Sequence, residues 1–198
     1  PVTQNFIFLE EGDVAEIRRD SVTVSDMEGN PVERKVQASQ LAASTADKGQ
    51  YRHYMLKEIH EQPGVIAETL EGRIHKGRLL EESFGHKAKQ LFDQTRNVHI
   101  IACVTSYHAA LVAKYWLEDV GILCSVEVAS EYRYRKVVVP PGTLFLTISQ
   151  SGETADTLAA LRASSSAGYL GSLTVCNVPE SSLVRESNVA LMTRAGPE

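Results

Sequence analysis

The sequence predicts an α/β fold, a three-layer α/β/α sandwich around a parallel sheet, preceded by a small β-meander. Two observations carry this prediction. From about residue 86, short continuous apolar segments alternate with amphipathic helical segments, which is typical of a parallel sheet covered on both faces. Before residue 38, apolar and polar residues alternate around turn-forming residues at Asp26–Pro31, which indicates antiparallel hairpins.

The chain can be divided further into elements. In its first part we expect strands at 6–9, 21–24 and 32–36, a small polar linker at 39–50, and helical segments at 51–62 and 65–70 separated by Pro63 and Gly64. In its second part we expect strands at 98–103, 122–129, 143–149, 170–176 and 188–193, and helices at 86–95, 106–120 and 154–167. The helix at 106–120 is expected to bury Val112, Ala113, Trp116, Leu117 and Val120. The elements suggest three segments, 1–46, 47–85 and 86–198.

Composition excludes several classes of protein. The 198 residues are 43% hydrophobic and 23% charged, with a net charge of −5, which is typical of a globular chain. Because the chain has neither a basic surplus nor a Lys/Arg stripe, we expect no nucleic-acid partner. Its apolar runs, such as Ile100–Val104, are far shorter than the roughly 18–20 residues that span a bilayer, so we expect no membrane partner.

The cysteines and histidines indicate neither disulfides nor metal sites. Three scattered cysteines, Cys103, Cys124 and Cys176, form no C-x-x-C motif, which favours reduced thiols and a cytoplasmic location. We expect Cys124 and Cys176 to be core residues. The six histidines show no metal-ligand spacing, and no nucleotide-binding glycine motif is present. We therefore assign no metal site to the chain.

Two loops rich in hydroxyl groups follow predicted parallel strands, where open α/β sheets bind ligands. Their candidate binding residues are Thr105 and Ser106 in the first loop, and Ser149, Gln150, Ser151 and Thr154 in the second. The second loop leads into a helix, whose first N–H groups carry partial positive charge, and Gly152 lets the main chain approach a ligand. The pattern favours a phosphate monoester bound without Lys or Arg. The alternative is that these hydroxyls only cap helices.

The segment Ser149–Thr157 resembles the phosphosugar-binding signature of the sugar isomerase (SIS) domain, in the version of the glutamine–fructose-6-phosphate aminotransferase family. Further resemblances to that family follow in chain order. Val2–Asp13 is similar to the end of its glutaminase domain, Asp47–Met55 and Glu61–Pro63 to its interdomain segment, and Ala129–Arg135 and Gly168–Leu173 to its first SIS domain. The resemblance covers essentially the whole chain.

The resemblance implies a function. Segment 1–46 would be the tail of an Ntn-hydrolase glutaminase domain, 47–85 a linker, and 86–198 a first SIS domain. The family enzyme converts fructose 6-phosphate and glutamine to glucosamine 6-phosphate and glutamate in hexosamine biosynthesis, needs no cofactor, and pairs through its SIS domains. The six loop residues match its sugar-phosphate ligands. Its catalytic groups fall outside this sequence, so we expect a piece of a longer protein that is inactive alone.

Three positions depart from the family pattern, because Val104, Ala110 and Glu180 stand where the family has glycine. Val104 matters most, since a β-branched residue resists unusual backbone angles and blocks close approach to a ligand. We expect it to weaken sugar-phosphate binding. The alternative is that Val104 ends the preceding strand and points into the core.

Two other functions stay open. One is a phosphosugar-binding SIS module of a regulator or a stand-alone isomerase, although a regulator is expected to carry a DNA-binding helix pair within residues 1–63. The other is a structural α/β domain whose loops only cap helices.

Overall fold

The computed structural model describes residues 5–38 and 48–196, and these two stretches belong to two compact units. The first unit consists of short antiparallel strands. β1 (Asn5–Ile7) pairs with β5 (Val36–Ala38), while β2 (Val14–Ile17), β3 (Val22–Ser25) and β4 (Pro31–Val32) form a separate sheet.

The predicted turn between β3 and β4 is present. The Asp26 carboxylate accepts hydrogen bonds from the backbone N–H groups of Glu28 (3.0 Å) and Asn30 (2.8 Å), which fixes the reversal of the chain. β2 is an addition to the predicted meander. Among residues 5–38, Val24 is the one buried hydrophobic side chain, so the described part of this unit has almost no core.

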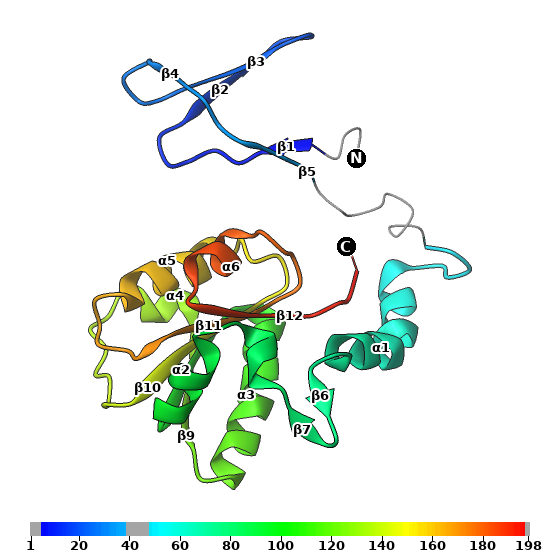
Figure 1. Cartoon of the computed structure of the whole chain (residues 1–198), viewed down its shortest axis with the longest axis vertical. Helices are drawn as coiled ribbons and strands as arrows, with labels where there is room; N and C mark the ends of the chain where they lie inside the picture. The colour runs from blue at the N-terminus through cyan, green and yellow to red at the C-terminus, as the bar shows by residue number, and fades with distance from the viewer. Residues whose placement is uncertain (1–4, 39–47, 197–198) are drawn as a thin grey trace. The chain divides into compact units, whose positions relative to one another are not determined.

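The second unit is built on a five-stranded parallel sheet with the order β12-β11-β10-β8-β9 (Figure 1). Its strands are β8 (Asn97–Ala102), β9 (Leu123–Val128), β10 (Thr143–Ser149), β11 (Gly171–Cys176) and β12 (Val189–Met192). Ile148 of β10 pairs with Ala102 of β8, and Ser149 pairs with Cys176 of β11. The carboxyl ends of the three central strands therefore meet at one edge.

Helices cover both faces of this sheet, as Figure 1 shows, which confirms the predicted three layers. On one face lie α2 (Ala88–Gln94) and α3 (Val104–Asp119); on the other lie α4 (Ala129–Tyr132), α5 (Ala155–Ser164) and α6 (Ser182–Glu186). Neighbouring strand residues divide between the faces. Ile100 packs with Ala110 of α3, whereas Ile101 packs with Phe145, α4, α5 and α6.

The residues before the sheet form α1 (Tyr54–Leu70), a hairpin of β6 (Ile74–His75) and β7 (Arg78–Leu79), and a 3-10 turn, η2 (Glu81–Phe84). The expected break at Pro63 is wrong, because α1 runs continuously through it. Proline removes the hydrogen bond from residue 63 to residue 59. Pro63 is exposed, so water can bond to the carbonyl group that is left free.

The expected buried side of α3 is partly wrong. Ala113 and Leu117 pack against the core as predicted, and Ala110 is completely buried between them and the sheet. Val112 is about half exposed, and Trp116 and Val120 are 71% and 70% exposed. Two apolar stripes run along this helix, and the one that contains the small residue Ala110 faces the sheet, because alanine lets the helix approach closely.

Candidate functional site

The candidate site lies where the connections of the sheet change direction. β8 and β10 are neighbours, but α3 leads from β8 to β9, whereas α5 leads from β10 to β11 on the opposite face. In open α/β sheets the crevice outside the strand ends at such a switch point is where ligands bind. All six predicted binding residues lie in the two segments that leave β8 and β10 at this point.

The second predicted loop, from Ser149 to Thr154, is held in shape by its own hydroxyl groups. Ser149 Oγ accepts a hydrogen bond from Gly152 N (3.0 Å) and lies 3.4 Å from Thr154 Oγ1. Ser151 Oγ accepts from Glu153 N at 3.2 Å. Ser149 is buried, whereas Ser151 and Thr154 are partly exposed, as is Gln150.

Position 152 requires glycine, both for its backbone conformation and for the space that its neighbours leave. Its φ of +67° lies in the left-handed region that favours glycine. A Cβ atom at this position would lie 2.0 Å from Ser181 Oγ and 2.8 Å from Cys176 Sγ. The backbone of the loop therefore lies directly against the segment that follows β11.

The first predicted loop places Thr105 and Ser106 in the opening turn of α3, where Thr105 is exposed and Ser106 is partly exposed. Val104 has a φ of +47° and its side chain is 78% exposed. The alternative that Val104 points into the core is therefore wrong. Glu180 also has a positive φ, +66°, whereas Ala110 is a buried helical residue. Two of the three departures from the family glycines thus occupy glycine-like conformations.

The helix-capping interpretation of the two loops is also wrong. The residues that precede the helices are Cys103 for α3 and Thr154 for α5, and none of the described side chains caps either helix start. The hydroxyls of the second loop bond within the loop instead. Two helix N-termini without side-chain caps therefore lie at the ends of adjacent strands.

One contributor to this region was not among the predicted site residues. The segment that follows β11 contacts the second loop through three backbone N–H groups, those of Asn177, Ser182 and Leu183. The signal in the sequence was a third pair of hydroxyl residues, Ser181 and Ser182, shortly after a predicted strand. Because parallel strands end at the same edge, that pair could have been placed beside the other two loops.

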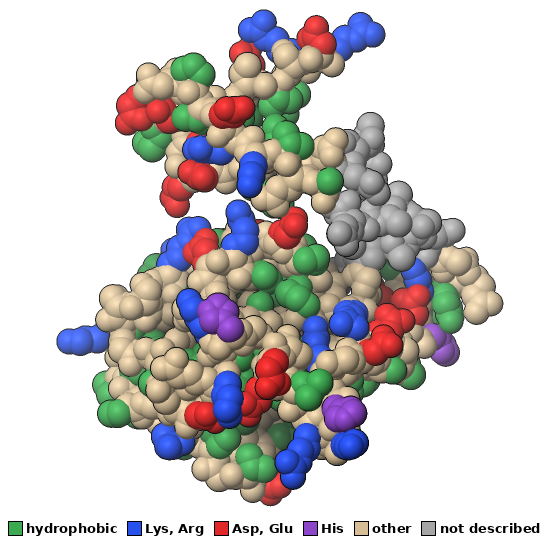
Figure 2. Space-filling view, viewed as in Figure 1, with side chains coloured by type: hydrophobic (Ala, Val, Ile, Leu, Met, Phe, Trp, Pro, Cys, Tyr) green, Lys and Arg blue, Asp and Glu red, His purple; other side chains and the backbone are tan. Residues whose placement is uncertain are grey.

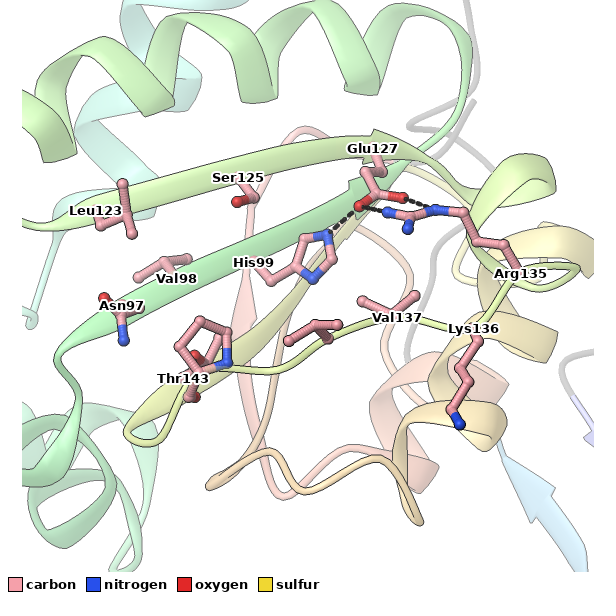
Figure 3. A pocket seen from close by; sticks show the side chains of 12 residues that line it. Asn97, Val98, His99, Leu123, Ser125, Glu127, Arg135, Lys136, Val137 and Thr143 are labelled. Carbon is pink, nitrogen blue, oxygen red and sulfur yellow. Dashed lines mark hydrogen bonds and ion pairs between the residues drawn. The ribbon is translucent and has the colours of Figure 1, made fainter.

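A second polar cluster lines a cavity of about 290 Å³ (Figure 3). The cavity lies on the face of the sheet that α4 covers. Glu127 lies between His99 and Arg135: His99 Nε2 is 3.1 Å from Glu127 Oε1, a contact by distance and not an aligned hydrogen bond, and Arg135 forms an ion pair with the same carboxylate. His99 Nδ1 is 2.7 Å from the hydroxyl of Tyr169. Burial lowers the pKa of His99, partly opposed by Glu127. The charges of Glu127 and Arg135 neutralise each other, so we assign this ion pair to anchoring the chain after β9.

The thiols occupy the places that the sequence predicts. Cys124 and Cys176 are 2% and 1% exposed, and burial raises the pKa of Cys124 to about 11. Cys103 is half-buried, with Sγ 3.6 Å from Thr157 Oγ1. In residues 5–38 and 48–196, no group of three or more His, Cys, Asp or Glu side chains is arranged to hold a metal ion.

The surface carries mixed charge. On the face in view in Figure 2, acidic and basic side chains are interspersed over the described residues. Of the helices that the structure describes, none has both the length and the apolar character that crossing a membrane requires.

Comparison with known proteins gives the family. The model of the SIS domain matches residues 91–198, which is more than half of the chain. The chain belongs to the SIS domain family. The five-stranded parallel sheet with helices on both faces is accordingly a SIS fold, as the resemblance implied.

Relatives extend the similarity beyond the SIS domain. The glutamine–fructose-6-phosphate aminotransferase (isomerizing) of Pseudomonas aeruginosa is 62% identical over 198 residues, which is all of this chain and 32% of the relative. That of Shewanella oneidensis is 55% identical over 199 residues, 33% of its length. The chain thus spans about a third of the length of these relatives.

Solved structures agree with this family. The C-terminal domain of glucosamine-fructose-6-phosphate aminotransferase from Francisella tularensis is 54% identical, with a TM-score of 0.75, over 77% of this chain and 43% of that chain. The sugar isomerase domain of an RpiR transcription factor from Sphaerobacter thermophilus matches with a TM-score of 0.53, over 71% of this chain and 75% of that one. At 16% identity the second match shows the SIS fold alone.

Proposed function

We propose that this chain is the sugar-phosphate-binding part of a glutamine–fructose-6-phosphate aminotransferase, and that it binds the phosphate of fructose 6-phosphate or glucosamine 6-phosphate. The observation that supports this most is the pair of hydroxyl-rich helix starts, α3 and α5, at the ends of adjacent strands. Identity of 62% with an aminotransferase of that name, along the whole chain, supports the choice of substrate.

The residues proposed to bind the phosphate differ in how far they are buried. Thr105, Ser106, Ser151 and Thr154 offer hydroxyl donors at the surface, and Gln150 offers an amide. Ser149 is buried beneath the loop, where it accepts from Gly152 N, so we assign it to shaping the loop. Hydrogen bonds to a dianion are about twice as strong as neutral ones, and each helix N-terminus adds roughly half a positive charge.

We further propose that the chemistry of amide transfer and isomerisation is carried out by groups outside this chain. In this proposal the described strands of residues 5–38 belong to the end of a glutaminase domain, residues 47–85 form a linker, and residues 86–198 the first SIS domain. The complete enzyme would be a cytoplasmic homodimer that pairs through its SIS domains. The antiparallel strands in residues 5–38 favour this function over that of a regulator, which would carry DNA-binding helices there.

Isothermal titration of the chain with fructose 6-phosphate tests the proposal, with fructose as the ligand control. We expect saturable binding of the phosphate ester only. Ser151→Ala should weaken that binding at least threefold. Ser166→Ala, which removes an exposed hydroxyl just beyond the other end of α5, is the matched control and should bind like the wild type. Equal binding of fructose, or unchanged affinity in Ser151→Ala, would contradict the proposed site.

A further inference from the structure

Glu153 is the one loop residue whose side chain reaches the segment after β11 in a described hydrogen bond. Its Oε1 accepts a hydrogen bond from Ser182 N at 2.7 Å. The other two links use the loop backbone: Gln150 O accepts from Asn177 N at 3.2 Å, and Gly152 O accepts from Leu183 N at 3.1 Å. The link through Glu153 is the shortest of the three.

The loop has no free space on the side of these links. A Cβ atom on Gly152 would lie 2.0 Å from Ser181 Oγ. The loop backbone therefore already touches the segment after β11, which forms a wall on this side of the loop. Movement of the loop is therefore possible only away from this wall. The three links oppose that movement.

The negative charge of Glu153 would affect the binding of a phosphate, so the position of its carboxylate matters. A carboxylate inside a loop that binds a dianion repels the ligand, and the repulsion is weaker where the carboxylate is held at a distance and hydrogen-bonded. The carboxylate of Glu153 is bonded at the start of α6, across from the loop, and not to the N–H groups of α5. The carboxylate is therefore hydrogen-bonded elsewhere than at the helix start that the phosphate would use.

We propose that Glu153 is a positioning residue for the sugar phosphate: by accepting the hydrogen bond of Ser182 N, it holds the loop from Ser149 to Thr154 in its binding geometry. This inference rests on the proposed function, because it assumes that the loop is the phosphate site. The competing explanation is that Glu153 only stabilises α6. The two differ in whether loss of the carboxylate changes ligand affinity or thermal stability alone.

The test is a titration of wild type, Glu153→Ala, Glu153→Gln and Glu186→Ala with fructose 6-phosphate, with the melting temperature of each. Glutamine keeps an acceptor oxygen for Ser182 N without the charge. Glu186 bonds Arg162 at 2.8 and 2.9 Å and so links α6 to α5 away from the loop, which makes Glu186→Ala the matched control. We expect Glu153→Ala to bind threefold to tenfold more weakly, Glu153→Gln to bind at least as tightly as wild type, and Glu186→Ala to lose stability without losing affinity.

The outcomes separate the positioning role from the site itself. If Ser151→Ala loses binding while Glu153→Ala binds like wild type, the phosphate site stands and the positioning role is wrong. If Glu153→Gln is as weak as Glu153→Ala, the hydrogen bond is not the reason and the proposal also fails. If the wild type shows no saturable binding, the proposed function fails, and the role of Glu153 fails with it.

Discussion

Replacing Val104 with glycine should stabilise the protein. The backbone at Val104 has a φ of +47°, and this left-handed conformation costs an L-residue roughly 1–2 kcal/mol. Glycine removes that cost but loses about 0.5–1 kcal/mol through its larger freedom in the unfolded chain. The side chain is 78% exposed, so little buried surface is lost. The net expectation is a gain of about 0.5–1 kcal/mol, or roughly 1–4 °C in melting temperature for a chain of this size.

Thermal unfolding followed by circular dichroism measures this effect. Val138→Gly is the matched control, because Val138 is 89% exposed and its φ is not positive, so glycine there should lower the melting temperature. The sequence suggests that Val104 weakens sugar-phosphate binding, but the backbone at this position already has the glycine-like angle. The cost of that angle is therefore a cost of folding, and we expect instead that Val104→Gly changes the affinity for fructose 6-phosphate less than threefold. An unchanged or lower melting temperature in Val104→Gly would refute the argument from backbone strain.

Three further predictions concern single groups. Gly152→Ala should cost more than about 2 kcal/mol and abolish fructose 6-phosphate binding, because its Cβ would overlap Ser181 Oγ; unchanged melting temperature and affinity would contradict this. Burial lowers the pKa of His99 below its ordinary value of 6.5, so on acidification the unfolded chain takes up the proton first and the free energy of unfolding should fall as the pH drops below about 6.5. The melting temperature of His99→Gln should depend less on pH. A melting temperature of the wild type that rises on acidification would contradict this prediction. At pH 8 the folded protein should alkylate slowly at Cys124, whose pKa is raised to about 11, and faster at the half-buried Cys103, as mass spectrometry of iodoacetamide adducts can show.

The sequence predicts the sheet well, because its strands are continuous apolar runs bounded by turn residues. The strand expected at 143–149 agrees residue for residue with β10. The strand expected at 98–103 is displaced by one residue from β8 at both ends, and that expected at 170–176 begins one residue before β11. The grouping of the two hydroxyl-rich loops also follows from the sequence, since parallel strands end at one edge.

What the sequence does not predict depends on contacts between distant residues. The helix α3 has two apolar stripes, and the sequence does not show which of them faces the sheet. The stripe that contains Ala110 packs against β8 and β9. The uncapped start of α5 and the link from Glu153 to Ser182 depend on side-chain directions that local pattern does not specify. Pro63 is expected to end a helix, but α1 continues through it at an exposed position, where water can bond to the carbonyl group that proline leaves free.

The phosphate is proposed to bind at the switch point between β8 and β10. The most direct measurement is amide chemical-shift mapping of the labelled chain during titration with fructose 6-phosphate. We expect the largest shifts at residues 104–106 and 149–155, and smaller ones at 181–183. Largest shifts around His99 and Arg135, in the cavity beside α4, or no shifts at saturating sugar phosphate, would contradict the claim.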